Sequence, residues 1–304
     1  MPVNVPDGLP AIDILHEENI FLMTEKRAQT QDIRPLEIAI VNLMPTKIDT
    51  ETQLLRLLSN TPLQVRVTLV SMSGHASKHT PTNHMDEFYL TSDEAMERRF
   101  DGLIVTGAPV ETLPFAEVDY WGQLTALFEW SRTHVYSTLF ICWGVNAALS
   151  WFYGVDKHLL ERKLSGIYEL EVYDNASYLL RGFDDRFLMP QSRYATVFPE
   201  DLEGTGLKVL AGSPEAGAVV FATPGHRQVF VTGHLEYDIF TLDREYQRDT
   251  LAGLAIDLPL NYYPDDDPAR PPQVRWRTYA HQFFANWLNH YVYQETPFDL
   301  GTIG

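Results

Sequence analysis

Residues 137–149 read Ser137-Thr138-Leu139-Phe140-Ile141-Cys142-Trp143-Gly144-Val145-Asn146-Ala147-Ala148-Leu149. The apolar run before Cys142 predicts a buried strand, and the run after Gly144 predicts a helix. A sharp turn from strand to helix lifts the side chain at the turn out of the packing, and the helix N-terminus favours a thiolate there. We therefore expect Cys142 to be a nucleophile, although a lone free cysteine is more often a small buried apolar residue.

A second motif supplies a candidate base. Residues 228–233 predict a strand, and His234-Leu235-Glu236 follows at its end. Because residues two apart on a strand share a face, we expect His234 and Glu236 to point the same way. Alone, such a pair would be interpreted as a surface pair beside a turn. With Cys142 it completes a nucleophile, a base and a group that orients the base.

The elements around these motifs alternate between strand and helix. Apolar runs predict strands over 36–44, 65–70 and 102–106, and periodic runs predict helices over 49–59, 116–134 and from about residue 242. Residues from about 160 to 232 are richer in strand. This order predicts an α/β fold with a mostly parallel sheet flanked by helices, in which ligands bind at the carboxyl ends of the strands.

Three regions are expected along the chain. Residues 1–35 predict an N-terminal extension that packs on the core or on a partner, and residues 36–258 predict the catalytic α/β domain. Residues 259–304 predict a proline-rich connector followed by an amphipathic helix over 276–293 that packs on the same domain. The aromatic face of that helix is also a candidate interface for a second copy.

Composition narrows the possible partners. The 304 residues are 45% hydrophobic, which allows a full core, and 23 basic against 41 acidic residues give a net charge of -18. Nucleic acids and anionic membranes need concentrated positive charge, so neither is an expected partner. No apolar stretch approaches the length of a membrane span, the first residues lack the pattern of a secretory signal, and one cysteine cannot form an intrachain disulfide. We expect a cytoplasmic protein.

Five motifs together resemble the homoserine O-acyltransferase family of methionine biosynthesis. They are Asn42-Leu43-Met44-Pro45-Thr46-Lys47, Thr106-Gly107-Ala108-Pro109, Ile141-Cys142-Trp143-Gly144, Ser192-Arg193-Tyr194 and Thr232-Gly233-His234-Leu235-Glu236-Tyr237-Asp238. The resemblance extends over nearly the whole chain, from Val3 to Leu300. It implies a core similar to the class I glutamine amidotransferases, a flavodoxin-like fold that agrees with the alternation described above.

The resemblance implies acyl transfer in two steps. Cys142 takes the acyl group from acyl-CoA as a thioester, and the hydroxyl group of L-homoserine then accepts it. His234 would activate the thiol and later deprotonate the hydroxyl group, while Glu236 would hold the imidazole. For the oxyanion we expect two backbone N–H donors, one from Trp143 and one from the turn around Gly107, by analogy with the fold.

Further residues carry over from the substrate site of the family. They are Lys163, Ser192 and Arg248, and Arg248 is a suitable cation for the carboxylate of homoserine. Without the resemblance, Lys163 and Arg248 would be interpreted as solvated cations paired with surface carboxylates. Lys47 is matched as well and would add positive potential near the thioester. The resemblance implies no metal and no permanently bound cofactor, and family members are typically homodimers.

The acyl donor depends on Glu111, which follows the Gly107 turn. Family members that use succinyl-CoA carry glycine at this position. A glutamate there would fill the space that the longer acyl chain needs and would repel its distal carboxylate, so we predict acetyl-CoA as co-substrate. Succinyl-CoA is the alternative, and it would apply if Glu111 were only a solvated acid at a turn.

Two other functional classes stay open. One is a cysteine amidotransferase or hydrolase on the same fold, and the other is a non-catalytic α/β binding protein in which Cys142 is buried and inert. Against an amidase, the chain has Phe140 two positions before the cysteine, where the glutamine amidotransferases usually have glycine. It also has Leu235 between the histidine and the glutamate, where they usually have proline.

Overall fold

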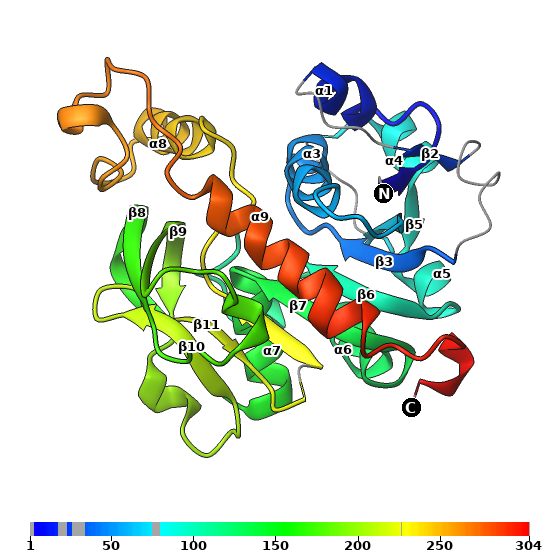
Figure 1. Ribbon diagram of the computed structural model, residues 1–304. Helices are drawn as coiled ribbons and strands as arrows, with labels where there is room; N and C mark the ends of the chain where they lie inside the picture. The colour runs from blue at the N-terminus through cyan, green and yellow to red at the C-terminus, as the bar shows by residue number, and fades with distance from the viewer. Residues whose placement is uncertain (1–2, 18–22, 26–33, 75–79, 226, 304) are drawn as a thin grey trace.

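The computed structural model describes residues 3–17, 23–25, 34–74, 80–225 and 227–303. One sheet runs through this part of the chain in the order β2-β1-β4-β3-β6-β7-β12-β11-β10-β8-β9, with β5 paired to β4 (Figure 1). Its strands are β1 (Val3–Val5), β2 (Met23–Thr24), β3 (Leu36–Val41), β4 (Val65–Ser71), β5 (Tyr89–Thr91), β6 (Phe100–Val105), β7 (Val135–Ile141), β8 (His158–Val172), β9 (Arg186–Thr196), β10 (Lys208–Ser213), β11 (Gly217–Ala222) and β12 (Gln228–Val231).

Helices connect most of these strands. The longer ones are α1 (Ala11–Glu17), α3 (Lys47–Leu58), α4 (Thr82–Phe88), α5 (Ser92–Met96), α6 (Trp121–His134), α7 (Trp143–Tyr153), α8 (Thr241–Leu251), α9 (Arg277–Asn286) and η5 (Trp287–Tyr293), a π-helical continuation of α9. The short 3₁₀ turns are η1 (Phe115–Glu117), η2 (Tyr178–Leu180), η3 (Pro199–Leu202), η4 (Pro264–Asp266) and η6 (Leu300–Thr302).

The parallel half of the sheet has helices on both faces. Alternation along β3 turns Ile38 and Ile40 toward a core shared with α1, α3 and α9, whereas Ala39 and Val41 face a second core built from α6 and α7. Strands β4, β3, β6, β7 and β12 pair in parallel, so their carboxyl ends meet at one edge of the sheet. The predicted α/β fold with a mostly parallel sheet is confirmed.

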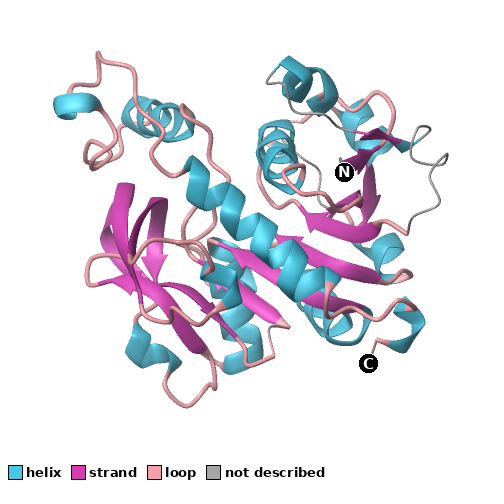
Figure 2. Ribbon diagram, in the orientation of Figure 1, coloured by secondary structure: helices cyan, strands magenta, loops and turns pink. Residues whose placement is uncertain are grey.

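The other half of the sheet is antiparallel. Strands β12, β11, β10, β8 and β9 pair in opposite directions and form the strand-rich lobe beside α8 (Figure 2). This lobe corresponds to the region from about residue 160 to residue 232 that the sequence predicts to be rich in strand. It brings β8 and β9, which carry Lys163 and Ser192, to the same part of the molecule as α8.

Several boundaries differ from the predictions. The helix predicted over 116–134 begins as α6 at Trp121, because residues 115–117 form the 3₁₀ turn η1 first. The strand predicted over 36–44 ends at Val41, and Asn42 onward turns toward α3. The short elements α4, β5 and α5 were not predicted, since their polar sequences show no clear period.

Both ends of the chain join the core. Within residues 1–35, β1 pairs in parallel with β4 and so extends the sheet. At the other end, α9 and η5 cross one face of the sheet (Figure 1), and the aromatic side chains of Phe283, Trp287 and Tyr291 are at most 1% exposed there. The aromatic face that the sequence analysis named as a candidate interface is therefore buried in the core of this chain.

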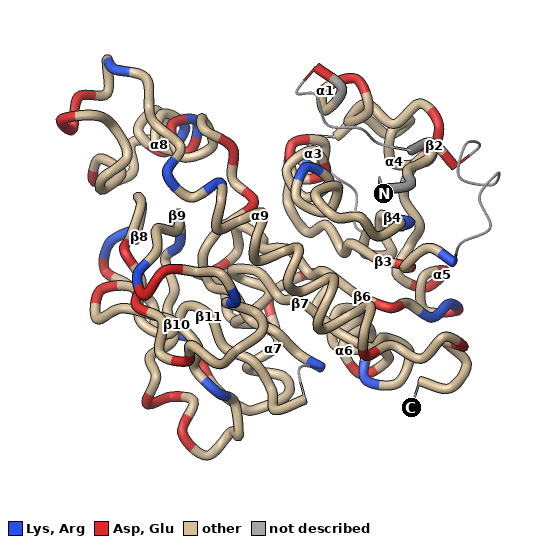
Figure 3. The backbone as a smooth tube through the Cα atoms, in the orientation of Figure 1, with Lys and Arg blue, Asp and Glu red and all other residues tan. Residues whose placement is uncertain are grey.

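Acidic and basic residues are both spread along the described part of the chain. Figure 3 shows acidic residues on both the helical and the antiparallel halves, in line with the net charge of -18. Among the described helices, none combines the length and the apolar character needed to cross a membrane.

Candidate active site

Cys142 occupies the sharp turn between β7 and α7. Its backbone is in a left-handed conformation, with φ 51° and ψ -116°, which is uncommon for a residue other than glycine. Its N–H donates to the carbonyl of Val231 at 2.8 Å, which ties the turn to the end of β12. Backbone strain of this kind is concentrated at functional sites. The side chain of Cys142 is buried, with 5% of its surface exposed. The predicted strand-cysteine-helix turn is confirmed, although Phe140 precedes it instead of glycine.

Two glycines let the chain pass close to this turn. A Cβ on Gly107 would lie 3.2 Å from the Cβ of Cys142 and 3.7 Å from the backbone nitrogen of Trp143. A Cβ on Gly144 would lie 2.9 Å from the carbonyl oxygens of Val105 and Thr106. The first turn of α7 therefore packs directly on the end of β6. At Gly144 this approach requires a residue without a side chain, and at Gly107 a side chain would be tight.

His234 and Glu236 form a buried pair beside the cysteine. Nδ1 of His234 lies 2.6 Å from Oε1 of Glu236, and both side chains are at most 8% exposed. The predicted pairing is correct, but the predicted reason is wrong, because β12 ends at Val231 and both residues lie in the loop that follows. The loop is held by the N–H of His234, which donates to the carbonyl of Pro190 at 2.9 Å.

The environment of His234 favours its protonated form. Burial alone would lower its pKa, but the sulfur of Cys142 and the carboxylate of Glu236 outweigh burial and raise the pKa well above its ordinary value. Its second ring nitrogen, Nε2, is buried and has no hydrogen-bond partner among the described residues. The ring is thus fixed by Glu236 at Nδ1, and Cys142 is among the groups that raise its pKa.

The proposed oxyanion donors lie beside the thiol. Trp143 is the first residue of α7, so its N–H has no acceptor one turn earlier in the helix. Gly107 follows β6 and faces Cys142, and the Cβ of an alanine there would lie 3.6 Å from the sulfur. The N–H of Trp143 and a donor from the Gly107 turn remain the predicted oxyanion hole.

The predicted substrate residues meet around α8. Lys163, from β8, lies with Nζ 2.8 Å from Oδ2 of Asp249, and its side chain is 7% exposed. Ser192, from β9, donates its hydroxyl to Glu245. Arg248 pairs with Asp249 at 2.7 Å, while its side chain stays 60% exposed. The structure brings Lys163, Ser192 and Arg248 together through these two carboxylates.

Lys163 keeps its proton in this setting. Burial would lower its pKa, but the neighbouring carboxylates of Glu245 and Asp249 outweigh burial, and the pKa lies above its ordinary value. The same contacts keep the pKa of Asp249 low, against the effect of burial. These are internal ion pairs, so the interpretation of Lys163 as a freely solvated cation does not hold.

Tyr237 belongs to the last of the five motifs, and it connects the two halves of the site. Its ring stacks on the imidazole of His234 with centroids 4.1 Å apart, and its hydroxyl donates to Glu245 at 2.9 Å. The indole of Trp276 donates to the carbonyl of Tyr237 at 3.1 Å, so the start of the C-terminal helix holds the loop that carries His234 and Glu236. The sequence did not assign this bridging role to Tyr237.

Glu111 lies in the loop after β6, at the same edge of the sheet. Burial raises the pKa of its carboxyl group, and the positive charges of Lys163 and His234 act in the opposite direction. Charges that act on one another are close in space, so Glu111 belongs with the candidate site and is not an isolated turn residue.

Lys47 lies at the start of α3 in a buried polar network. Its ammonium group donates to the carbonyls of Asn42 and Met44, and burial lowers its pKa to about 8. The carboxylate of Glu51 accepts from Tyr89 at 2.5 Å and is the nearest opposing charge. These contacts bind β3 to α3, and a role of Lys47 near the thioester remains a prediction.

Arg193 is a buried charge next to the site. It is 1% exposed and donates to Gln191 and to the carbonyl of Ala216 at 2.5 Å. Burial lowers its pKa to about 10, and the charges of Cys142 and Glu111 limit the fall. Arg193 lies in β9 shortly after Pro190, whose carbonyl holds the His234 loop. The sequence placed Arg193 in one of the five motifs but assigned it no structural role.

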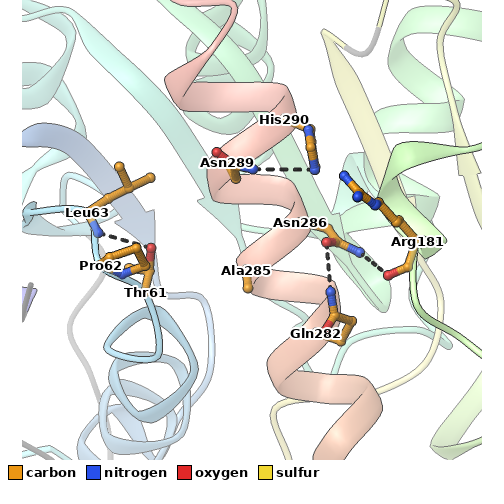
Figure 4. Close-up of a pocket in the computed structure, with 9 residues that line it drawn as sticks. All are labelled: Thr61, Pro62, Leu63, Arg181, Gln282, Ala285, Asn286, Asn289 and His290. Carbon is orange, nitrogen blue, oxygen red and sulfur yellow. Dashed lines mark hydrogen bonds between the residues drawn. The ribbon is translucent and has the colours of Figure 1, made fainter.

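A separate pocket of about 460 Å³ lies between the loop after α3 and the C-terminal helix (Figure 4). It is lined by Thr61, Pro62, Leu63, Arg181, Gln282, Ala285, Asn286, Asn289 and His290. None of the candidate site residues lines it. This pocket is therefore distinct from the candidate active site.

The family model described as "Homoserine O-succinyltransferase" matches residues 2–298 of the chain. The chain belongs to this family. It is 55% identical to a homoserine O-acetyltransferase of Acetivibrio thermocellus and 56% identical to one of Thermotoga neapolitana, with 100% of both chains covered in each case. It is 53% identical to a homoserine O-acetyltransferase of Streptococcus thermophilus, over 99% of this chain and 96% of that one.

Solved structures of other families share the fold. A glutamine amidotransferase of Thermotoga maritima is 14% identical with a TM-score of 0.56, and the match covers 86% of this chain and 100% of that one. A GMP synthase protein of Thermoplasma acidophilum is 15% identical with a TM-score of 0.50, over 71% and 99%. The core of this homoserine acyltransferase family member is therefore similar to the class I glutamine amidotransferases.

Proposed function

We propose that this chain is a homoserine O-acetyltransferase, which transfers the acetyl group of acetyl-CoA to the hydroxyl group of L-homoserine. The observation that carries the proposal is the buried Cys142, His234 and Glu236 constellation in a chain 55% and 56% identical, over its full length, to homoserine O-acetyltransferases. The products are CoA and O-acetyl-L-homoserine, a precursor for methionine biosynthesis.

In the first step, the sulfur of Cys142 attacks the thioester carbonyl carbon of acetyl-CoA. The new carbon–sulfur bond gives a tetrahedral oxyanion, which the N–H of Trp143 and the turn at Gly107 stabilise. The bond to the CoA sulfur then breaks, and His234 supplies the proton that CoA takes away. Cys142 is left as an acetyl thioester, close in energy to the donor thioester.

In the second step, His234 accepts the proton of the homoserine hydroxyl group as its oxygen attacks the enzyme thioester. The bond to Cys142 breaks, and O-acetylhomoserine leaves. Glu236 holds the imidazole in one tautomer at 2.6 Å and stabilises its charged form in both steps. Arg248 binds the carboxylate of homoserine, with Lys163 and Ser192 beside it.

Acetyl-CoA is the proposed donor because Glu111 borders the site. Its side chain occupies volume that a succinyl chain would need, and its ionised form would repel the distal carboxylate of succinate. The full-length relatives named above are acetyltransferases, which supports the same choice. Neither step, as proposed, requires a metal or a permanent cofactor.

The experiment that tests this function offers a choice of donors. The enzyme is incubated with homoserine and equal concentrations of acetyl-CoA and succinyl-CoA, and the product is identified by mass. We expect O-acetylhomoserine to dominate. Dominance of O-succinylhomoserine would refute the choice of donor, and glutamine hydrolysis without any transfer to homoserine would favour the amidotransferase alternative.

We also infer that the enzyme acts as a cytoplasmic homodimer. The single cysteine supports the compartment, because disulfides are rare in the reducing cytoplasm, and the homodimers typical of the family support the dimer. The aromatic face of α9 is buried inside the chain, so a dimer would use another surface. Light scattering coupled to size-exclusion chromatography measures the state, and a mass of one chain at all concentrations would contradict a dimer.

A further inference from the structure

A cluster of aromatic side chains lies where the loop after β6 passes α6 and α7. Phe115 and Trp121 stack with ring centroids 4.9 Å apart, and Trp121 meets Trp151 edge to face at 6.4 Å. Trp151 is 43% exposed, which makes it the most exposed of the six tryptophans. Both helices follow parallel strands, so both begin near the carboxyl edge of the sheet, on the face opposite α9 (Figure 1). We call Phe115, Trp121 and Trp151 the aromatic platform.

The outermost ring of the platform is held in one orientation. The indole nitrogen of Trp151 donates to Oε1 of Glu129 at 2.8 Å, and its contact with Trp121 fixes the ring from a second direction. The rest of the indole surface faces water. A tryptophan held in this way suits a planar aromatic ligand, because stacking then costs little additional ordering of the side chain.

Ring contacts connect the platform with the thiol. Phe115 contacts Trp143 with centroids 6.2 Å apart, and Trp143 follows Cys142 directly in the chain. A run of aromatic rings therefore extends from the residue next to the nucleophile to the exposed indole of Trp151. A long substrate that reacts at the thiol can extend along this run and end on the platform.

Lys157 supplies a positive charge beside this run. Its ammonium group lies 4.6 Å from the ring centroid of Phe115 and donates to the carbonyl of Leu113 at 2.7 Å, in the loop that carries Glu111. The charge of Glu111 acts on both Lys157 and His234, so this loop is near the catalytic pair and near the lysine. Lys157 forms no ion pair with the described residues, which leaves its charge available to an anion.

We propose that the aromatic platform and Lys157 bind the nucleotide end of acetyl-CoA, with the adenine ring on Trp151 and a phosphate group at Lys157. This rests on the proposed acetyltransferase function. The order of groups is the same in ligand and protein: the thioester at Cys142, the pantetheine arm along the loop after β6, then the phosphates and the adenine. Adenine has a flat π face and CoA carries several negative charges, so stacking and charge attraction both act at this surface.

The first measurement is the binding of CoA and of adenosine 3′,5′-bisphosphate, which represents the nucleotide end alone, by isothermal titration calorimetry. Trp151→Ala should raise the Kd of both ligands by about 5- to 100-fold, the range for the loss of one stacked base. Trp151→Phe retains a ring face and should stay within about threefold of wild type. Tyr293→Ala changes an aromatic side chain on η5 that is 54% exposed, and as the matched control it should bind like wild type.

The second measurement compares acetyl-CoA with S-acetylpantetheine, a donor without the nucleotide, in transfer to homoserine. Trp151→Ala should raise KM for acetyl-CoA by about fivefold or more, and Lys157→Gln by about two- to fivefold, with kcat nearly unchanged because neither side chain contacts the thioester. For S-acetylpantetheine, both variants should keep the wild-type kcat/KM. Lys208→Gln, at a side chain that is 63% exposed, is the control for the loss of a positive charge.

The outcomes separate this proposal from the proposed function. Equal affinity of wild type and Trp151→Ala for CoA and for the bisphosphate overturns the platform as a nucleotide site, and so does an equal loss of kcat/KM with both donors. Binding of CoA that depends on Trp151, in an enzyme that transfers no acetyl group to homoserine, supports the platform and refutes the acetyltransferase function.

Discussion

At the scale of single residues, the account rests on the strained turn at Cys142 and on the proposed role of Glu111 in donor choice. Cys142 has a strained backbone, with φ at 51°, and the glycines Gly107 and Gly144 leave room for the sharp turn that it makes. The sequence predicted the cysteine, the histidine and the glutamate, because each follows an apolar run. It could not predict Glu245, since a carboxylate on an amphipathic helix looks like an ordinary solvated acid until β8 and β9 bring Lys163 and Ser192 to it.

The donor prediction belongs to Glu111. Replacing it by glycine should open volume and remove a negative charge, so the ratio of kcat/KM for succinyl-CoA over acetyl-CoA should rise by about tenfold or more, as expected when a repulsive element is removed. Steady-state kinetics with each donor and saturating homoserine measures this ratio. The exposed glutamate Glu117 offers a control, since Glu117→Gly should leave the ratio unchanged. An unchanged ratio in Glu111→Gly would show that other residues set the donor.

The close approach of Gly107 to Cys142 leads to a prediction about the geometry of the turn at the thiol. An alanine there would place its Cβ 3.2 Å from the Cβ of Cys142, which is tighter than an ordinary contact, so the cysteine or the Gly107 turn must move by a few tenths of an ångström. We expect the rate of CoA release to fall by about 10-fold, because a displacement of a few tenths of an ångström disturbs the reacting geometry less than a shift of about 1 Å would, and we expect a small change in stability.

The matched control is Gly122→Ala in α6, whose added Cβ meets nothing within 4 Å. It should keep the wild-type rate and gain up to about 1 kcal/mol in unfolding free energy from helix propensity. Stopped-flow detection of free CoA measures the rates. Equal rates for Gly107→Ala and wild type would mean that the turn is not part of the reacting geometry.

At the scale of secondary structure, strands and helices position the site residues, and hydrogen bonds between segments distant in sequence hold these elements together. Strands β3, β6 and β7 were predictable because their apolar runs are buried on both faces. The conformation of the His234 loop could not be predicted. The loop is anchored by hydrogen bonds to Pro190 and Trp276, which are distant in sequence, and this anchoring places His234 beside Glu236. The connector after residue 258 is likewise held by β8, through reciprocal backbone bonds between Leu260 and residues 165 and 167.

That connector depends on Gly166. Its φ is +136°, and an added Cβ would lie 2.3 Å from the backbone nitrogen of Leu260. Gly166→Ala should therefore lower the unfolding free energy by about 2–4 kcal/mol, from backbone strain plus the forced displacement of the connector. Gly253 also has a positive φ, at +72°, but nothing lies within 4 Å of the added Cβ, so Gly253→Ala should cost only about 1 kcal/mol. Urea unfolding compares them, and equal losses would contradict the role of the Leu260 contact.

At the scale of the whole molecule, stability depends on buried charge as well as on the two apolar cores. Burial lowers the pKa of Lys47 to about 8, whereas an unfolded lysine keeps its ordinary value near 10.5. Between these two pH values the unfolded chain binds a proton at Lys47 that the folded chain does not. The contribution of Lys47 to the unfolding free energy therefore rises as pH increases from about 8 to 10.5.

Lys47→Met removes this titration. The wild-type enzyme should gain stability relative to the variant by about 1 kcal/mol per pH unit across that window. Chemical denaturation at several pH values gives the difference, and Lys208→Met, a change at a side chain that is 63% exposed, provides the control. If the difference in unfolding free energy between wild type and Lys47→Met does not change with pH, the lowered pKa of Lys47 in the folded enzyme is contradicted.

The central claim is that Cys142 carries the acetyl group between the two substrates. Intact-mass and peptide mass spectrometry of the enzyme mixed with acetyl-CoA alone, quenched in acid, measures this directly. The account predicts one acetyl group on the peptide that contains Cys142, lost on adding homoserine with the appearance of O-acetylhomoserine, and absent from Cys142→Ala. Product formation by Cys142→Ala, or an acetyl group on another residue that homoserine does not discharge, would contradict it.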